Sequence, residues 1–223
     1  MADRLAGHEL VPLTLPGHGG AGAVETTFEA AAAGLAEAGG PGVWVGYSMG
    51  GRFALRVALE RPDLVHGLVL LGASPGLPDA DQRAARRLVD ETLATGLERK
   101  GLEPFLDGWL KLPLFQRLAK EAAGLEERRA NTVEGLASAL RRHGSGAQEP
   151  LWDRLSELGM PVLLMAGEYD ASYVALAFRM AGPIQKVAEI SIVPGAGHAA
   201  HLERPEAFAG LLERYLARHH GTP

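Results

Sequence analysis

A serine flanked by glycines is the motif with the clearest chemical meaning in this chain. Residues 46–50 read Gly-Tyr-Ser-Met-Gly, which matches the pattern G-x-S-x-G and centres on Ser48. In this pattern a sharp turn from a strand to a helix presents the serine hydroxyl, and glycines relieve the crowding because they lack a Cβ atom. About 0.1 matches are expected by chance in so glycine-rich a sequence, and the position directly after the apolar run Val43–Val45 favours a functional turn. The motif therefore predicts a chemically active serine.

A serine becomes reactive only with a base and with a carboxylate that orients the base. Asp170 follows the apolar run Val162–Ala166, and His198 follows the apolar run Val187–Val193. Successive parallel strands end at one edge of a sheet, so both side chains are expected to meet Ser48 there, in the chain order Ser, Asp, His. A single histidine at a strand end is more often structural, but three such residues in this order predict a catalytic triad of Ser48, Asp170 and His198.

His201 is the alternative base. It lies one helical turn after His198 and beside Glu203, and we expect it to support the site or to face the substrate. The pair of His198 and His201 could suggest a metal ion, but no third ligand is evident. We therefore predict no metal.

A second glycine motif, Gly17–Gly22, matches G-x-G-x-x-G, and Glu37 follows it by twenty residues. A dinucleotide-binding fold places that acidic residue at the end of the next strand, where it reaches the ribose. Here the next strand is expected to end at the serine motif, and Glu37 falls inside the preceding helix. The spacing disfavours a nucleotide site.

Short apolar runs alternate with helical patterns around these motifs. The expected strands cover residues 9–15, 43–45, 64–71, 162–166 and 187–193, and the expected helices cover residues 25–38, 53–59, 172–181 and 205–217. This alternation predicts an α/β fold with a mostly parallel sheet flanked by helices. Residues 78–149 carry only charged helical patterns, so we expect a helical cap inserted into a core of residues 1–77 and 150–223.

Composition bounds the class of protein. The 223 residues are 47% hydrophobic, carry a formal charge of −5 and include no cysteine. These values exclude disorder, disulfides and thiol chemistry, and they argue against a nucleic-acid partner. No apolar run approaches the length of a membrane span, and the first residues do not form a signal peptide. We therefore expect a soluble cytoplasmic protein with no membrane partner.

Together these motifs resemble the α/β-hydrolase family, and within it the synthases of menaquinone biosynthesis that eliminate pyruvate from 2-succinyl-5-enolpyruvyl-6-hydroxy-3-cyclohexene-1-carboxylate. The similarity covers nearly the whole chain. It is carried by Leu15–Gly19, Gly46–Arg52, Ser74–Leu77, Asp81–Arg83 with Arg86, Trp109, Phe115, Arg129–Asn131, Gly167–Asp170 and Gly195–His201. The resemblance implies an α/β-hydrolase fold with a helical cap, and a lyase that needs no cofactor and takes a small anionic tricarboxylate as substrate.

The resemblance also implies roles for the triad. Ser48, made basic by His198, would take a proton from the substrate ring, and no acyl-enzyme would form. Asp170 would hold the imidazole tautomer and stabilise its cation. The N–H group of Met49 would be the oxyanion donor.

Five further residues are implied to contact the substrate. Arginine binds carboxylates through its planar fork, so Arg52, Arg86 and Arg129 would clamp the anionic groups. Each arginine could instead lie on a solvated helix face, and for Arg129 this alternative is about as good. Tyr47 and Trp109 would complete the substrate contacts.

The sequence departs from the family at its beginning. The resemblance implies additional N-terminal strands, including a central one whose following loop donates a second oxyanion N–H group. This chain begins after that strand, so we expect the N-terminal strands to be missing and the chain to be truncated. Loss of one oxyanion donor lowers the rate by about 10²–10³ in acyl-transfer enzymes.

Two other functions stay open. A serine-dependent ester or thioester hydrolase would use the same triad, but its pocket for neutral esters would be apolar. A catalytically inactive binding protein would bind a dicarboxylate without turnover. The sequence does not decide between a monomer and a homo-oligomer.

Overall fold

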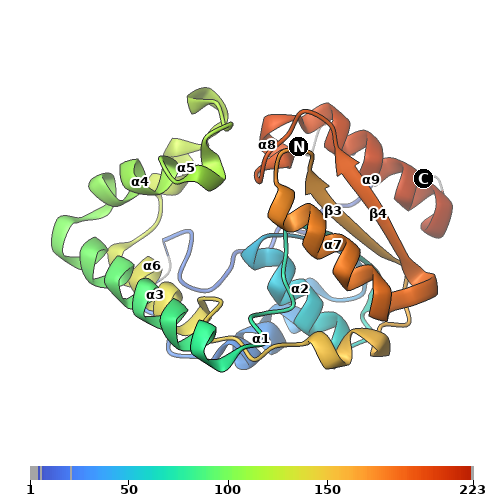
Figure 1. The fold of residues 1–223 in the computed structure, drawn as a ribbon, viewed down its shortest axis with the longest axis horizontal. Helices are drawn as coiled ribbons and strands as arrows, with labels where there is room; N and C mark the ends of the chain where they lie inside the picture. Colours follow the sequence, from blue (N-terminus) through green and yellow to red (C-terminus); the bar gives the residue numbers. More distant parts are fainter. Residues whose placement is uncertain (1–4, 6, 21, 222–223) are drawn as a thin grey trace.

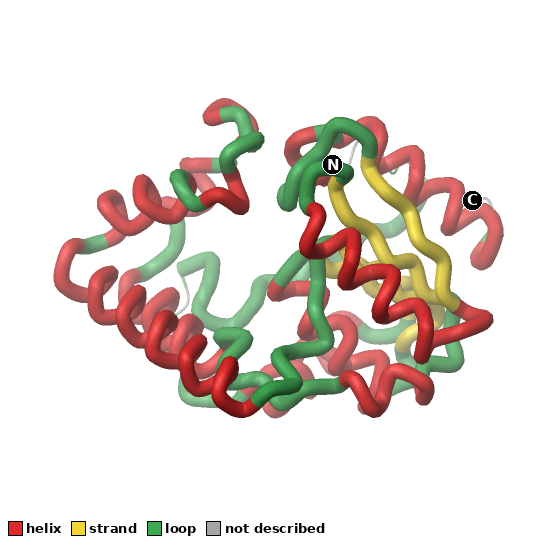
Figure 2. Tube along the Cα trace, viewed as in Figure 1, coloured by secondary structure: helices red, strands yellow, loops and turns green. Residues whose placement is uncertain are grey.

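The computed structural model describes residues 5, 7–20 and 22–221. The prediction that the chain has no signal peptide concerns mainly residues 1–4, which lie outside this range. Figure 1 shows two lobes, one with all the labelled strands and one built from the helices α3, α4, α5 and α6. Colouring by secondary structure makes the same division plain, because the strands lie in one lobe only (Figure 2).

The first lobe contains a parallel sheet of four strands in the order β1-β2-β3-β4. Its strands are β1 (Gly42–Tyr47), β2 (Val65–Leu71), β3 (Val162–Gly167) and β4 (Ala188–Val193). All four agree with expected strands to within a few residues. Because the strands are parallel, their carboxyl ends lie at one edge, where the residues that follow β1, β3 and β4 can meet.

Helices cover both faces of this sheet. They are α1 (Phe28–Gly39), α2 (Met49–Glu60), α7 (Ala171–Ile184), α8 (Ala200–Glu203) and α9 (Pro205–His220). Leu68 and Leu70 pack in one apolar cluster with α1, α2 and α7, whereas Val69 and Leu71 pack in a second cluster with α9. This alternation is the two-residue period of a strand that is buried on both faces.

The second lobe is built from helices and short turns between Ala80 and His143. It contains α3 (Ala80–Lys100), α4 (Leu102–Leu110), the 3₁₀ turns η2 (Pro113–Phe115) and η3 (Lys120–Ala122), α5 (Leu125–Arg129) and α6 (Val133–His143). Asp79 and Thr132 cap α3 and α6 with their side-chain oxygens. Ala94, Leu97 and Ala137 form a small apolar cluster of this lobe. Two more 3₁₀ turns, η4 (Trp152–Glu157) and η5 (Gln185–Val187), belong to the first lobe.

The strand expected at residues 9–15 is wrong. The segment has no regular secondary structure, and Leu10 and Val11 are exposed. Leu13 and Leu15 nevertheless pack against the first apolar cluster. In the described sheet β1 is bonded to β2 alone, so side-chain packing holds this segment without a ladder of backbone hydrogen bonds. An apolar run predicts burial, but a strand also needs a neighbouring strand.

Within the described ranges, no helix combines the length and the apolar character needed to cross a membrane.

Candidate active site

Ser48 occupies the turn between β1 and α2 in a strained conformation. Its φ is 49° and its ψ is −110°, and it is one of two described non-glycine residues with positive φ. A Cβ atom at Gly46 would lie 2.5 Å from the carbonyl oxygen of Gly50, so the first glycine of the motif is required by crowding. At Gly50 a Cβ atom would meet nothing within 4 Å, whereas at Gly51 it would lie 2.5 Å from the Cβ of Ala73. The second crowded glycine is therefore Gly51, and the expectation for Gly50 is wrong.

The structure brings the three expected triad residues together. His198 Nε2 lies 3.2 Å from Ser48 Oγ, and His198 Nδ1 lies 2.7 Å from Asp170 Oδ2. The carboxylate can only accept, so Nδ1 carries the proton and Nε2 presents its lone pair to the serine hydroxyl. The imidazole is only 2% exposed. This geometry allows His198 to take a proton from Ser48.

His201 is packed away from the reacting atoms. Its ring centroid lies 4.4 Å from that of Tyr47 and 6.2 Å from that of Phe208. Burial, with the nearby His198 and Arg128, lowers the pKa of His201 to about 4. His201 is therefore neutral at physiological pH, and the histidine hydrogen-bonded to Ser48 is His198.

Glu203 anchors the loop that carries His198. Its Oε2 accepts the N–H of Gly197 at 2.6 Å, and its Oε1 accepts the N–H of Ala199 at 3.1 Å. One carboxylate thus fixes the backbone on both sides of the histidine. Glu203 was expected only as a neighbour of His201, because a bond to a backbone amide leaves no signal in side-chain spacing.

Tyr47 does not line the cavity described below. Its ring packs against those of His198 and His201, at 5.2 and 4.4 Å between centroids. Burial raises the pKa of its hydroxyl. The side chain thus supports the two histidines, and the expected substrate contact by Tyr47 stays a prediction.

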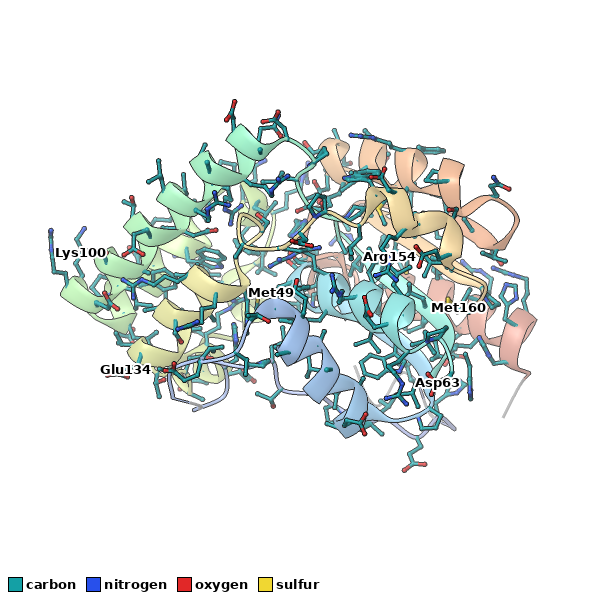
Figure 3. All side chains as sticks on the ribbon, turned by 90° about the horizontal axis from the view of Figure 1, so that it is seen from below. Met49, Asp63, Lys100, Glu134, Arg154 and Met160 are labelled. Atoms are coloured by element: carbon teal, nitrogen blue, oxygen red, sulfur yellow. The ribbon has the colours of Figure 1, made fainter. Side chains whose placement is uncertain are left out.

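A cavity of about 390 Å³ opens between the two lobes beside Ser48. Helices of the second lobe supply apolar walls that include Phe105, Leu106 and Trp109. Met49 also lines the cavity, and it lies between the two lobes in Figure 3. Its N–H group begins α2, and the first N–H groups of a helix have no partner within the helix. The role of that group as an oxyanion donor stays a prediction.

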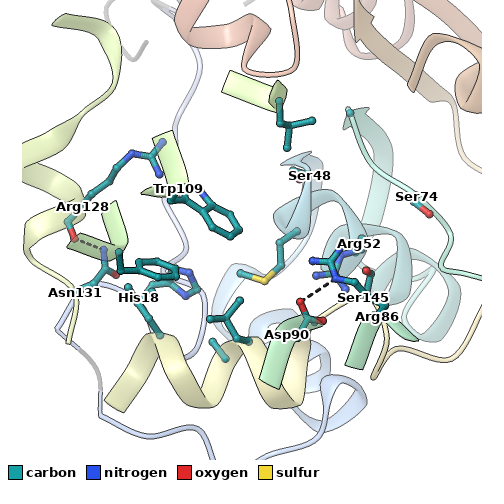
Figure 4. Close-up of a pocket in the computed structure, with 18 of the residues that line it drawn as sticks. His18, Ser48, Arg52, Ser74, Arg86, Asp90, Trp109, Arg128, Asn131 and Ser145 are labelled. Carbon is teal, nitrogen blue, oxygen red and sulfur yellow. Dashed lines mark hydrogen bonds and ion pairs between the residues drawn. The ribbon is translucent and has the colours of Figure 1, made fainter. Parts of the chain in front are cut away.

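Three arginines line this cavity: Arg52, Arg86 and Arg128. Figure 4 shows Arg52 and Arg86 near Asp90 on one side, and Arg128 on the other side, with Trp109 between them. Arg86 Nε donates to Asp90 Oδ1 at 2.8 Å. Burial raises the pKa of the Asp90 carboxyl, and Arg86 opposes this shift. Two of the three expected arginines, and Trp109, thus lie where an anionic ligand could bind.

Arg129 is the expected arginine that the cavity does not contain. Its guanidinium donates to Glu103 at 2.8 Å and to Glu126 at 2.6 Å on the protein surface. The preceding residue, Arg128, faces the cavity instead and donates from Nε to the carbonyl oxygen of Ala123. Consecutive helical residues point about 100° apart, so both side chains cannot face inward. The structure thus places Arg128 at the cavity in the position expected for Arg129, and a substrate contact by either arginine stays a prediction.

The cavity also contains polar residues that were not expected as ligands, among them His18 and Tyr173. His18 Nδ1 lies 3.2 Å from the carbonyl oxygen of Pro16, and burial lowers the pKa of the imidazole. Tyr173 packs its ring against that of His198, with 4.7 Å between centroids. Tyr173 lies one turn after Asp170, and this spacing is the signal that could have found it.

The glycine turn that contains His18 does not open a helix. A Cβ atom at Gly17 would lie 2.5 Å from the carbonyl oxygen of Gly135, and the next helix begins only at Phe28. Ala21, inside the motif, lies outside the described residues. The turn packs against α6, which agrees with the rejection of a nucleotide site.

No group of three or more metal-ligating side chains with suitable geometry occurs among the residues that the structure describes.

Comparisons with known proteins agree on one family. The model of the "Alpha/beta hydrolase family" matches residues 1–211. A putative 2-succinyl-6-hydroxy-2,4-cyclohexadiene-1-carboxylate synthase from Bacillus subtilis is 38% identical over 77% of this chain, and the match spans 64% of that protein, less than two thirds of its length. The synthase of the same name from Serratia proteamaculans is 32% identical, with 97% of this chain and 86% of the relative covered.

The solved structures give the same result. The structure of MenH from S. aureus matches with a TM-score of 0.85 and 32% identity, covering 93% of this chain and 82% of that one. A thermophilic esterase from Thermogutta terrifontis, 24% identical, matches with a TM-score of 0.73 over 92% of this chain and 78% of the esterase, and it supports the fold alone.

Proposed function

Because this chain belongs to the alpha/beta hydrolase family, we propose that it is an enzyme that eliminates pyruvate from 2-succinyl-5-enolpyruvyl-6-hydroxy-3-cyclohexene-1-carboxylate. The product would be 2-succinyl-6-hydroxy-2,4-cyclohexadiene-1-carboxylate, the compound for which the relatives from Bacillus and Serratia are named. The reaction is a step of menaquinone biosynthesis. It needs a base, a pocket for several carboxylates and no cofactor.

The observation that carries this proposal is that Arg52 is a buried cation hydrogen-bonded only to uncharged oxygens. The side chain lies one turn after Ser48, is only 9% exposed and lines the cavity. Both of its hydrogen bonds end on neutral oxygens, one of Gln148 and one of His143. Burial is the main cause that lowers its pKa, to about 10, so the guanidinium stays charged at neutral pH. A buried cation beside the reactive serine is best satisfied by an anionic substrate.

The proposed chemistry uses Ser48 as a base. Ser48 gives its proton to His198 Nε2 and takes the acidic proton from the substrate ring. The electron pair of the broken C2–H bond forms a C2–C3 double bond, and the former C3–C4 double bond moves to C4–C5. The C5–O bond then breaks, and its electron pair leaves with the enolpyruvate oxygen. The departing enolpyruvate takes a proton from the imidazolium and becomes pyruvate. Asp170 stabilises the imidazolium through its bond to Nδ1.

In this proposal the second lobe, residues 78–149, is the cap. Its residues Phe105, Trp109 and Arg128 close the cavity above Ser48. An apolar wall excludes water and strengthens the interaction of the arginines with carboxylates. Arg86 and Arg128, on opposite sides of the cavity in Figure 4, fit a substrate whose carboxylates are spread over its ring and side chain.

The alternative is a serine-dependent ester hydrolase. The hydrogen bond from Ser48 to His198 favours it, because the same pair activates serine for acyl transfer. The three arginines in the cavity argue against neutral esters as substrates.

An assay of both reactions tests the proposal. Pyruvate released from freshly generated substrate is followed with lactate dehydrogenase and NADH, and the spontaneous decay of the substrate is subtracted. We expect release far above this background in the wild type and background release in Ser48→Ala. Cleavage of p-nitrophenyl esters without pyruvate release would establish the hydrolase instead.

A further inference from the structure

Two uncharged oxygen atoms hold the guanidinium of Arg52. Its Nη1 donates to Gln148 Oε1 at 2.9 Å, and its Nη2 donates to the carbonyl oxygen of His143 at 2.7 Å. Arg86, on the same side of the cavity, is paired with the carboxylate of Asp90 at 2.8 Å. Arg52 is thus fixed in position by two acceptors that carry no charge.

Because both hydrogen-bond acceptors are uncharged, the positive charge of Arg52 remains available to a ligand. Buried charges in proteins are normally paired, because removal from water costs several kcal/mol that an opposite charge offsets. Asp90 acts on Arg52 through space, but it is hydrogen-bonded to Arg86. The counter-charge that Arg52 lacks can therefore come from a carboxylate in the cavity.

Gln148 is well placed for this task. It lies in the segment that returns from α6 to the first lobe, and 96 positions separate it from Arg52. Its side chain is 1% exposed, and its Nε2 has no hydrogen-bond partner among the described residues. A buried amide with one unsatisfied end is costly, so the bond from Oε1 to Arg52 is the polar interaction that orients this side chain.

We propose that Gln148 is a specificity-determining positioning residue, which holds Arg52 rigidly without neutralising it and thereby selects polycarboxylate ligands. Glutamate at this position would have nearly the same shape, and it would pair with the guanidinium by a charge-assisted bond. The charge of Arg52 would then be neutralised while its side chain stayed in place. This inference rests on the proposed function only for the identity of the natural substrate.

The test separates charge from position with three variants. Gln148→Glu neutralises Arg52, Gln148→Met removes the acceptor but adds no charge, and Gln116→Glu adds the same charge at an exposed site of the second lobe. Circular dichroism checks the fold of each variant. Isothermal titration calorimetry with succinate, a simple dicarboxylate, measures anion binding without turnover.

We expect Gln148→Glu to weaken succinate binding by at least about tenfold, which corresponds to about 1.4 kcal/mol. Gln148→Met should weaken it by about two- to fivefold, because the charge remains but the guanidinium is held less firmly. Gln116→Glu should stay within about twofold of the wild type, because charges at the surface are screened. In the pyruvate assay, Gln148→Glu should raise KM with little change in kcat, the signature of lost uniform binding.

Three results would overturn the inference: no succinate binding by the wild type, wild-type affinity in Gln148→Glu, or equal losses in Gln148→Glu and Gln148→Met. If Gln148→Glu does not fold, Gln148→Met decides, and wild-type affinity in that variant overturns the inference. If the wild type binds succinate and the variants follow the expected order, but no pyruvate is released, the proposed function fails and this inference stands.

Discussion

His198 Nε2 lies 3.2 Å from Ser48 Oγ, although 150 positions separate the two residues in the chain. The contact depends on Gly72, which lies outside both the serine motif and the segment that carries His198. A Cβ atom at Gly72, directly after β2, would lie 2.9 Å from His198 Cε1. The imidazole therefore occupies space left free by the missing side chain, between two strand ends that the parallel sheet brings together.

Asp170→Asn tests the orientation of the imidazole. The amide can donate its own proton toward Nδ1, which favours the wrong tautomer and removes the charge that stabilises the imidazolium. We expect kcat for pyruvate release to fall by about 10²–10⁴, with little change in the folded structure. Asp153→Asn, a change at an exposed site of the first lobe, is the control and should keep wild-type kcat. Equal activity of the Asp170 variant and the wild type would contradict the triad.

Gly50→Ala and Gly51→Ala are a matched pair on α2. A Cβ atom at Gly51 would overlap Ala73, and we expect a loss of about 1–3 kcal/mol in the free energy of unfolding. At Gly50 the space is open, and alanine favours a helix by up to about 1 kcal/mol. Urea unfolding of both variants measures the difference. A larger loss at Gly50 than at Gly51 would show that the crowding is misassigned.

Arg128→Met and Arg129→Met test which of the two neighbours binds the substrate. Arg128 lines the cavity, so its loss should raise KM for pyruvate release by about tenfold or more, the effect of one lost charged contact. Arg129 pairs with Glu103 and Glu126 at the surface, so its loss should leave KM and kcat unchanged. If steady-state kinetics showed a raised KM for Arg129→Met and an unchanged KM for Arg128→Met, Arg129 would be the substrate ligand, as the sequence predicted.

The low pKa of His201 predicts that the stability of the protein depends on pH. Its pKa in the folded state is about 4, below the ordinary value of 6.5, so the unfolded chain binds the proton more readily. The stability that neutral His201 contributes is fully present above pH 6.5 and is lost as the pH falls toward 4. Between pH 7 and pH 5 this loss is about 2 kcal/mol. Urea unfolding at the two pH values should show a smaller difference in His201→Phe than in the wild type.

The same variant separates the two histidines in catalysis. Because His198 is the histidine hydrogen-bonded to Ser48, and His201 packs against Tyr47, His201→Phe should still release pyruvate, whereas His198→Ala should not. An inactive but folded His201→Phe would contradict the assignment of the base.

Much of the fold followed from hydrophobic periodicity. The four observed strands and the helices between them were predicted because buried parallel strands and amphipathic helices have distinct patterns. The expected strand at residues 9–15 failed because an apolar run reports burial and not the presence of a bonding neighbour. The triad was predicted because strand order brings Ser48, Asp170 and His198 to one edge of the sheet.

The cavity was harder to predict. Whether Arg128 or Arg129 faces inward depends on the rotation of α5, a helix of only five residues. Gln148, Glu203 and Gly72 act through contacts with residues far away in the chain or with backbone amides. Such contacts leave no periodic or motif signal, so only the folded structure reveals them.

In the proposed reaction Ser48 and His198 act as a base and not as an acyl nucleophile. The most direct test is a single-turnover measurement with substrate deuterated at the ring carbon that loses its proton. We expect slower pyruvate release than from the protiated substrate, and an unchanged intact mass of the enzyme during turnover. Equal rates for the two substrates, together with a covalent adduct on Ser48, would contradict it.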